Sequence, residues 1–179
     1  MLIYEMFKNA DPRHLAYVGT STVTYGELEK AVDCYRNTLY ALGIRKGDRV
    51  GLYTANCAEF VYVYMGVTSL GAIIVPINNS LVDREVDYIL KDAGAKLLVS
   101  DTPLTVSCDF IELSRLNEKA FSENAPAAPD VSGELSEDDV CALVYTSGTT
   151  GNPKGAMLTH KNQIRNVEQY VQLVPVDEH

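Results

Sequence analysis

A run of hydroxyl, glycine and lysine residues lies near the end of the sequence, between Tyr145 and His160, and reads YTSGTTGNPKGAMLTH. Glycines let backbone N–H groups approach a ligand closely, and clusters of such groups favour anions. The hydroxyl side chains add donors, and Lys154 adds one compact positive charge. A polyphosphate has several oxygens that each accept hydrogen bonds, so it is the ligand that this chemistry fits best.

The position of this run also favours a binding loop. It follows the apolar segment VCALVYT, which is typical of a strand in a sheet. In α/β proteins, ligands bind in the crevice outside the carboxyl ends of the strands. A flexible surface loop would have a similar composition, but here a strand enters, Pro153 stiffens the middle and the apolar residues AML follow.

The spacing does not match an ordinary P-loop. That motif has four residues between its first glycine and a Gly-Lys-Ser/Thr unit. Here Lys154 follows Pro153 and precedes Gly155, so neither the second glycine nor the hydroxyl that binds Mg²⁺ is in place. A phosphotransferase of the P-loop type is therefore the less favoured alternative.

The elements around this run alternate between strands and helices. Residues 15–25 predict two short strands joined by a turn, and Thr24 with Glu27 forms a capping box for the helix that follows. Apolar spacing predicts that this helix ends at Gly43. Further strands are predicted over 48–54, 72–77, 95–101 and 140–146, and further helices over 60–71, 83–94 and 161–174. This order predicts an α/β fold with a mostly parallel sheet flanked by helices and a small N-terminal β-hairpin.

Two segments lie outside this alternation. Residues 117–139, NEKAFSENAPAAPDVSGELSEDD, are rich in prolines, small residues and acids, and we expect a surface connection there. At the start of the last helix, the sequence favours a capping or packing role for Thr159, His160 and Asn162 over contact with a ligand.

Composition limits the classes of protein. The chain has 179 residues, 46% of them hydrophobic and 22% charged, as in an ordinary globular domain. Its net charge of −9 argues against nucleic acid or an anionic membrane as the main partner. No apolar stretch is long enough for a transmembrane helix, and no secretory signal is visible. The four cysteines are widely scattered, which favours reduced thiols and a cytoplasmic protein.

The segment YTSGTTGNPKGAMLTHKN closely resembles the phosphate-loop signature of the AMP-forming adenylating enzymes, which include acyl-CoA synthetases, luciferases and peptide-synthetase adenylation domains. VTYGELEKAVD and GVTSLGAIIVPINNSLVDREVDYILKDAGAKLLVSD resemble two earlier blocks of the family, so the resemblance extends from about His14 to the end. The stretch GAIIVPINNSL is more similar to acyl-CoA ligases than to peptide-synthetase domains, which indicates a fatty or aromatic acid as substrate.

The resemblance implies a reaction in two steps. A carboxylic acid attacks the α-phosphate of MgATP to give an acyl-adenylate and pyrophosphate, and the thiol of CoA then takes the acyl group. The loop would orient the β- and γ-phosphates, and Gly155 would be a glycine in the turn of that loop. The residues that the resemblance assigns to phosphate contacts are Thr146, Ser147, Gly148, Thr149, Thr150, Gly151 and Lys154.

The resemblance also implies that residues 1–179 are the N-terminal portion of an adenylation domain. The family's nucleotide, Mg²⁺ and acyl contacts and its catalytic lysine lie further along a longer protein, so we expect neither a catalytic residue nor a metal ligand in this chain. The alternative to an enzyme is a fragment that binds nucleotide or phosphate without turnover. In either case we expect apolar surface that could support a homo-oligomer.

Overall fold

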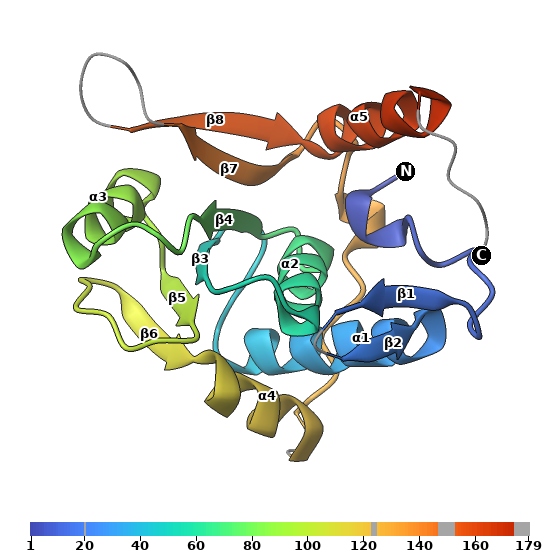
Figure 1. Ribbon diagram of the computed structural model, residues 1–179, viewed down its shortest axis with the longest axis horizontal. Helices are drawn as coiled ribbons and strands as arrows, with labels where there is room; N and C mark the ends of the chain where they lie inside the picture. Colours follow the sequence, from blue (N-terminus) through green and yellow to red (C-terminus); the bar gives the residue numbers. More distant parts are fainter. Residues whose placement is uncertain (20, 123–124, 147–152, 174–179) are drawn as a thin grey trace.

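The computed structural model describes the whole chain except residues 20, 123–124, 147–152 and 174–179 (Figure 1). In chain order its elements are η1 (Ile3–Glu5), β1 (Leu15–Val18), β2 (Thr22–Thr24), α1 (Tyr25–Ala41), β3 (Arg49–Tyr53), α2 (Ala58–Ser69), β4 (Ile73–Ile77), α3 (Asp83–Ala93), β5 (Leu97–Ser100), β6 (Asp109–Glu112), α4 (Leu113–Ser122), η2 (Ser132–Glu134), β7 (Val140–Thr146), β8 (Lys154–Thr159) and α5 (His160–Leu173).

The described strands form two sheets. β1 and β2 pair antiparallel as the small N-terminal hairpin, and a 6-stranded sheet has the order β6-β5-β3-β4-β7-β8. In the larger sheet all neighbours are parallel except β7 and β8. The predicted α/β fold with a mostly parallel sheet is therefore confirmed.

Both faces of the parallel strands are covered, because successive side chains of a strand point to opposite faces. Val50 and Leu52 of β3 pack into a core shared with α1, α2 and α4. Tyr53 of β3 and Leu98 of β5 pack instead into a second core under α3. No residue of α2 is exposed, which agrees with its nearly uniform apolar sequence.

The predicted ends of two helices are confirmed in detail. At the start of α1, the Thr24 hydroxyl accepts a hydrogen bond from the Glu27 N–H at 3.3 Å, and the Glu27 carboxylate accepts one from the Thr24 N–H at 2.8 Å. These two bonds form the expected capping box. Gly43 follows α1 with φ +90°, and Gly94 ends α3 with φ +60°, both in the region that favours glycine.

The predicted surface connection over residues 117–139 is wrong in its first part. Residues 117–122 belong to α4, where Leu113, Leu116 and Ala120 are buried against the core. Their spacing of three and four residues is helical, but the polar residues between them suggest a loop when the sequence is read alone. Residues 125–139 are irregular apart from η2, so this part of the predicted connection agrees with the structure.

The end of the sheet differs from a plain strand–loop–helix arrangement. After the signature, the chain returns as β8, antiparallel to β7, before α5 begins. In Figure 1 the two strands extend past the rest of the sheet, and their free end lies over α3. The two strands that precede and follow residues 147–153 thus form a hairpin.

Candidate functional site

Two of the residues assigned to phosphate contacts lie at facing ends of this hairpin. Thr146 is the last residue of β7 and Lys154 the first of β8, and their Cα atoms are register partners. Both residues are exposed. The Lys154 ammonium makes no hydrogen bond or ion pair with any residue that the structure describes, so its charge is available to an anion.

The other assigned contacts, Ser147, Gly148, Thr149, Thr150 and Gly151, lie outside the described residues. Their roles stay predictions. The structure nevertheless brings together the two strand ends that enter and leave this segment.

Gly155 does not have the role expected from the sequence. It lies inside β8, and it is absent from the residues with positive φ. A Cβ atom at this position would lie 2.9 Å from Cζ of Tyr145, its register partner. The expectation of a turn glycine is therefore wrong, and the missing side chain instead leaves space for the Tyr145 ring.

Tyr145 connects the hairpin to α3. Its hydroxyl donates a hydrogen bond to Oδ2 of Asp92 at 2.6 Å, and its ring packs against the apolar core under that helix. Burial, followed by the hydrogen bond to the Asp92 carboxylate, raises the pKa of Tyr145. The phenol therefore stays protonated and acts as a donor.

A pocket of about 400 Å³ opens beside the hairpin, near the carboxyl end of β7. Its walls come from the ends of β3, β4 and β7 and from α2, and its lining residues are Thr54, Asn56, Phe60, Pro76, Ile77, Asn78, Asn79, Val144 and Tyr145. The connection after β3 leads to a helix on one face of the sheet, and the connection after β4 leads to a helix on the other. Ligands of α/β proteins bind at such a switch point.

Hydrogen bonds fix the loops that form this pocket. Tyr53 donates through its hydroxyl to the carbonyl oxygens of Asn79 at 2.8 Å and Leu81 at 2.9 Å. Asp101 accepts from the Thr54 hydroxyl at 2.9 Å and from the Ala55 N–H at 2.8 Å. The loops after β3 and β4 are therefore both held to neighbouring strands, and these hydrogen bonds fix the walls of the pocket.

This pocket and a neighbouring one differ in the charge of the residues that line them. The second pocket, of about 340 Å³, lies at the ends of β3, β5 and β6 and is lined by Glu59, Asp101 and Glu112. Carboxylates repel phosphate, whereas none of the residues that line the pocket beside the hairpin is charged. The neutral pocket is therefore the better neighbour for a phosphate-binding segment.

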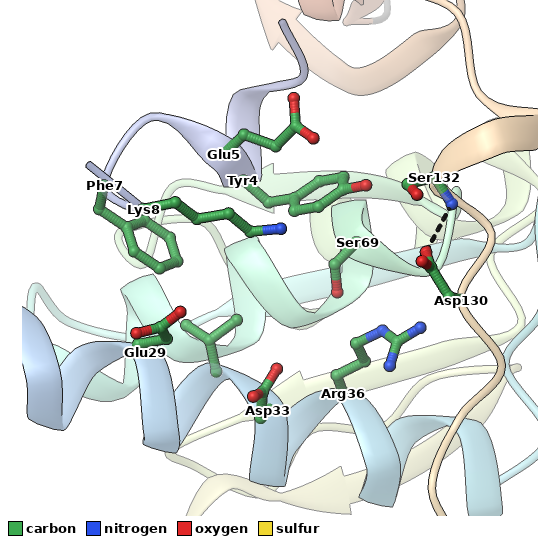
Figure 2. Close-up of a pocket in the computed structure, with 11 residues that line it drawn as sticks. Tyr4, Glu5, Phe7, Lys8, Glu29, Asp33, Arg36, Ser69, Asp130 and Ser132 are labelled. Atoms are coloured by element: carbon green, nitrogen blue, oxygen red, sulfur yellow. Dashed lines mark hydrogen bonds between the residues drawn. The ribbon is translucent and has the colours of Figure 1, made fainter.

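A third cavity, of about 220 Å³, lies between η1, α1 and the irregular connection (Figure 2). Arg36 is already used there, since it donates to the carbonyl oxygens of Ala128, at 3.2 Å, and Pro129. Lys8 lies over the ring of Tyr4, 5.2 Å from its centroid. Because Arg36 and Lys8 already have these partners, we interpret the contacts around this cavity as structural: they join the irregular connection to α1.

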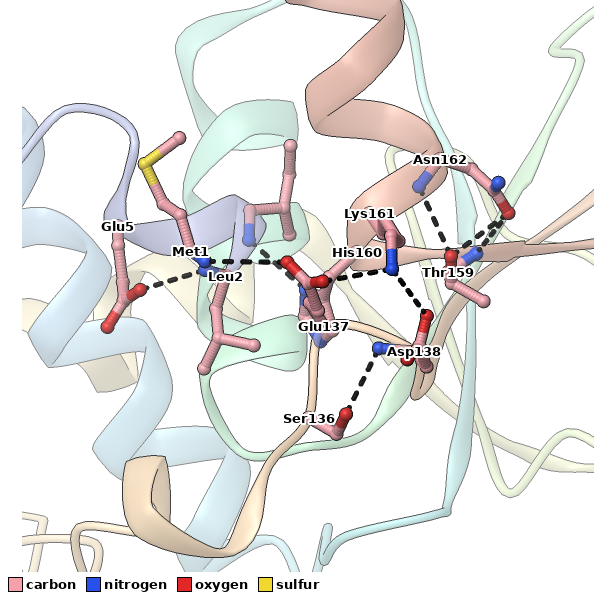
Figure 3. Close-up of polar contacts among 11 residues, drawn as sticks. Met1, Leu2, Glu5, Ser136, Glu137, Asp138, Thr159, His160, Lys161 and Asn162 are labelled. Carbon is pink, nitrogen blue, oxygen red and sulfur yellow. Dashed lines mark hydrogen bonds and ion pairs between the residues drawn. The ribbon is translucent and has the colours of Figure 1, made fainter.

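The residues after the signature have the structural role that the sequence favours. Thr159 and Asn162 cap α5 reciprocally: the Asn162 side-chain oxygen accepts from the Thr159 N–H at 3.1 Å, and the Thr159 hydroxyl accepts from the Asn162 N–H at 3.1 Å (Figure 3). His160 is buried, and its Nδ1 accepts a hydrogen bond from the N–H of Ile3 at 3.1 Å. His160 thus faces the N-terminal segment.

Metal ligands do not gather in the part of the chain that the structure describes. None of its His, Cys, Asp and Glu residues form a group of three or more that could hold a metal ion. These residues therefore offer no site for a resident Mg²⁺. Within the same residues, no helix is both long and apolar enough to cross a membrane.

The chain has an α/β fold whose sheet ends in an antiparallel hairpin, and the two strands of this hairpin flank a sequence rich in hydroxyl and glycine residues. A family model described as AMP-binding enzyme matches residues 5–178. The chain belongs to the AMP-binding enzyme family.

Curated relatives in this family are CoA ligases. Long-chain-fatty-acid–CoA ligase FadD13 of Mycobacterium tuberculosis strain H37Rv is 38% identical over 84% of this chain and 33% of its own length. Crotonobetaine/carnitine–CoA ligase of Escherichia coli O1:K1 is 36% identical over 78% of this chain and 31% of its own length. This chain therefore spans about a third of the length of these relatives.

Solved structures match almost the whole chain. The inhibitor-bound N-terminal domain of FACL13 from M. tuberculosis has a TM-score of 0.85 at 32% identity, covering 97% of this chain and 47% of that one. O-succinylbenzoate coenzyme A synthetase (MenE) from Bacillus subtilis, in complex with AMP, has a TM-score of 0.86 at 27% identity, covering 99% and 47%.

The pocket beside the hairpin was not predicted from the sequence. Its signal was present in Asn78 and Asn79, which directly follow the apolar strand 72–77, and in Thr54 after the strand before it. Polar residues at the carboxyl ends of neighbouring strands indicate a site. Which strands are neighbours, however, depends on the sheet order, and the order was not predicted.

Proposed function

We propose that this chain is the N-terminal, phosphate-binding portion of an ATP-dependent acyl-CoA synthetase. The observation that carries the proposal is the facing pair of Thr146 and Lys154, which belong to the family's signature and lie beside a neutral pocket at the switch point of the sheet. The proposed substrates are a carboxylic acid, MgATP and CoA. The name of the FadD13 relative supports a fatty acid as the acid.

In the proposed mechanism, the chain binds and orients the polyphosphate of ATP. The Lys154 ammonium would neutralise charge on the β- and γ-phosphates, and the Thr146 hydroxyl would donate to a phosphate oxygen. Charge that develops on departing pyrophosphate would be stabilised by the same donors, which are fixed in advance at the ends of paired strands. Mg²⁺ would arrive with ATP and supply further neutralisation of the phosphates.

The first test is a product assay on the complete protein encoded by the gene. With ATP, CoA and a fatty acid, we expect AMP, pyrophosphate and an acyl-CoA. Formation of ADP would instead support a phosphotransferase. Nucleotide binding without any product would support a binding fragment without turnover.

The second test is phosphate binding by the 179-residue chain. Charge-assisted hydrogen bonds contribute about 1.5–3 kcal/mol each, so we expect Lys154→Ala to weaken ATP and pyrophosphate binding at least about tenfold. Lys30→Ala is the matched control, because it removes the same charge from an exposed position on α1. Equal affinities for the two variants in a calorimetric titration would contradict the proposal.

The proposed location is the cytoplasm. All four cysteines are described by the structure, and all are free thiols. This supports a reducing compartment, in which disulfides are rare. Fractionation of cells that express the tagged protein would test it.

A further inference from the structure

Asp92 is an unfavourable residue at its position in α3, and its hydrogen bond to Tyr145 is a feature that the helix alone does not require. Asp92 lies in the last turn of α3, where the partial negative charge of the helix end disfavours a carboxylate. It is also exposed, so it contributes nothing to the core. Lys91, the basic residue of this turn, is already paired with Asp87 at 2.6 Å. The specific partner of Asp92 is the Tyr145 hydroxyl.

The position of Tyr145 connects this bond to the candidate site. Tyr145 directly precedes Thr146, and its register partner Gly155 directly follows Lys154. One side chain therefore contacts both strands within one residue of the two predicted phosphate contacts. Gly155 lets the ring lie close to β8, because a Cβ atom there would be 2.9 Å from Cζ and 3.1 Å from the hydroxyl oxygen.

Tyr145 lies where β7 extends beyond its register pairing with β4. β7 pairs with β4 through a single register pair, Ile74 with Ala142, and Thr146 lies four residues beyond that pair. On its other side β7 contacts only β8, whose described residues 154–157 are exposed. Beyond this register pair, Tyr145 packs against the core under α3 and its hydroxyl donates to Asp92, so this part of the hairpin is joined directly to α3.

We propose that Tyr145 and Asp92 are positioning residues for phosphate binding: their hydrogen bond, over Gly155, sets where the hairpin presents Thr146 and Lys154. The inference rests on the proposed function, which assigns phosphate contacts to those two residues. It adds a requirement that the signature alone does not contain, namely an acceptor on α3, which is more than fifty positions earlier in the chain.

The test uses affinity for inorganic pyrophosphate and ATP, measured by titration calorimetry on the 179-residue chain. We expect Tyr145→Phe and Asp92→Ala each to weaken both affinities about tenfold. We expect Asp92→Asn to retain most of the affinity, because its side chain keeps an oxygen that can accept the bond. The double variant Tyr145→Phe/Asp92→Ala should be no weaker than either single variant, since both remove the same interaction.

Two controls separate positioning from general stability. Tyr88→Phe removes a hydroxyl from a neighbouring tyrosine in the same apolar cluster, and we expect its affinity to equal that of the wild type. Melting temperatures show whether each variant is folded at the titration temperature. Folded Tyr145→Phe and Asp92→Ala variants with wild-type affinity would overturn the inference, and so would an Asp92→Asn variant as weak as Asp92→Ala.

A second measurement does not depend on phosphate binding. If Tyr145 and Asp92 hold the hairpin, amide hydrogen exchange at Thr146 and Lys154 should be faster in both variants than in the wild type. Should the wild-type chain bind neither pyrophosphate nor ATP, the proposed function fails. Faster exchange in the variants would then still support the inference that Tyr145 and Asp92 hold the two strand ends in place. Unchanged exchange would refute that inference.

Discussion

At the scale of single residues, Gly155 is expected to be intolerant of a side chain. In Gly155→Ala the new Cβ would contact the Tyr145 ring at 2.9 Å, so the ring must move and the hydrogen bond to Asp92 is lost. We expect the free energy of unfolding to fall by about 1 kcal/mol, the usual net contribution of a hydrogen bond. Urea denaturation of the purified chain would measure it.

The same substitution in a Tyr145→Ala background is the internal control. Without the ring, the methyl group at position 155 meets no obstacle there, and alanine suits a strand no worse than glycine. We therefore expect Gly155→Ala to leave the free energy of unfolding unchanged in that background. An equal loss in the free energy of unfolding in both backgrounds would show that the Tyr145 ring is not what requires glycine at position 155.

Residue types in the signature were readable from the sequence, but their partners were not. The hydroxyls, glycines and lysine indicate an anion because their chemistry is local. Asp92 could not be linked to Tyr145 in this way, since only the folded hairpin brings these positions together. The role of Gly155 was misjudged for the same reason: its neighbour in β7 is set by strand register.

At the scale of elements, the capping box of α1 gives a direct prediction. Replacing Thr24 with alanine removes the oxygen that accepts the Glu27 N–H, so we expect a loss of about 1 kcal/mol in the free energy of unfolding. Thr105→Ala is the control, because Thr105 is exposed and donates through its backbone, which the substitution keeps. A smaller loss for Thr24→Ala than for Thr105→Ala in chemical denaturation would contradict the assignment.

Elements with strong periodicity were predicted well. α3 is an example, since Val86, Ile89, Leu90 and Ala93 are all buried on the face that the spacing indicates. β8 was missed because its first four residues are exposed, including Met157, so its sequence shows no alternation of buried and exposed positions. It is a strand because the hairpin brings it beside β7 and satisfies its backbone groups.

At the scale of the whole molecule, the last helix exposes an apolar surface. Tyr170, Val171 and Leu173 of α5 are respectively 61%, 51% and 83% exposed, and Met157 of β8 is 69% exposed. Exposed apolar patches commonly mark interfaces. We therefore expect the isolated chain to self-associate as concentration rises, and Val171→Glu to reduce this association in sedimentation velocity. A chain that stays monomeric at all concentrations would contradict the expectation, and Thr105→Glu is the control for added charge.

The two ends of the described chain are joined through His160. Its Nδ1 accepts the N–H of Ile3, a contact between residues 157 positions apart, while Gln163 on the same helix accepts from the Tyr64 hydroxyl at 2.8 Å. A protonated imidazole has no free nitrogen to accept the Ile3 N–H. The packing of η1 against α5 therefore requires neutral His160 (Figure 3).

This requirement makes stability depend on pH in a defined direction. Burial lowers the pKa of His160 from 6.5, outweighing the nearby carboxylates of Asp139 and Glu5, which raise it, while the N-terminal ammonium lowers it further. Below about pH 7, His160 therefore binds more protons in the unfolded chain than in the folded chain. Its stabilising contribution is complete above the pKa that it has in the unfolded chain. The contribution is lost as the pH falls through the pKa that it has in the folded chain.

We expect the melting temperature of the wild type to fall between about pH 7 and pH 5, with a smaller fall in His160→Asn. Asparagine is chosen because its side-chain oxygen can accept the Ile3 N–H but does not titrate. His14→Asn, at an exposed position, should keep the wild-type slope. If the melting temperature of His160→Asn fell with pH as steeply as that of the wild type, the expectation would be wrong. Protonation of other groups would then control the stability in acid, and the contact between η1 and α5 would not contribute to the pH dependence.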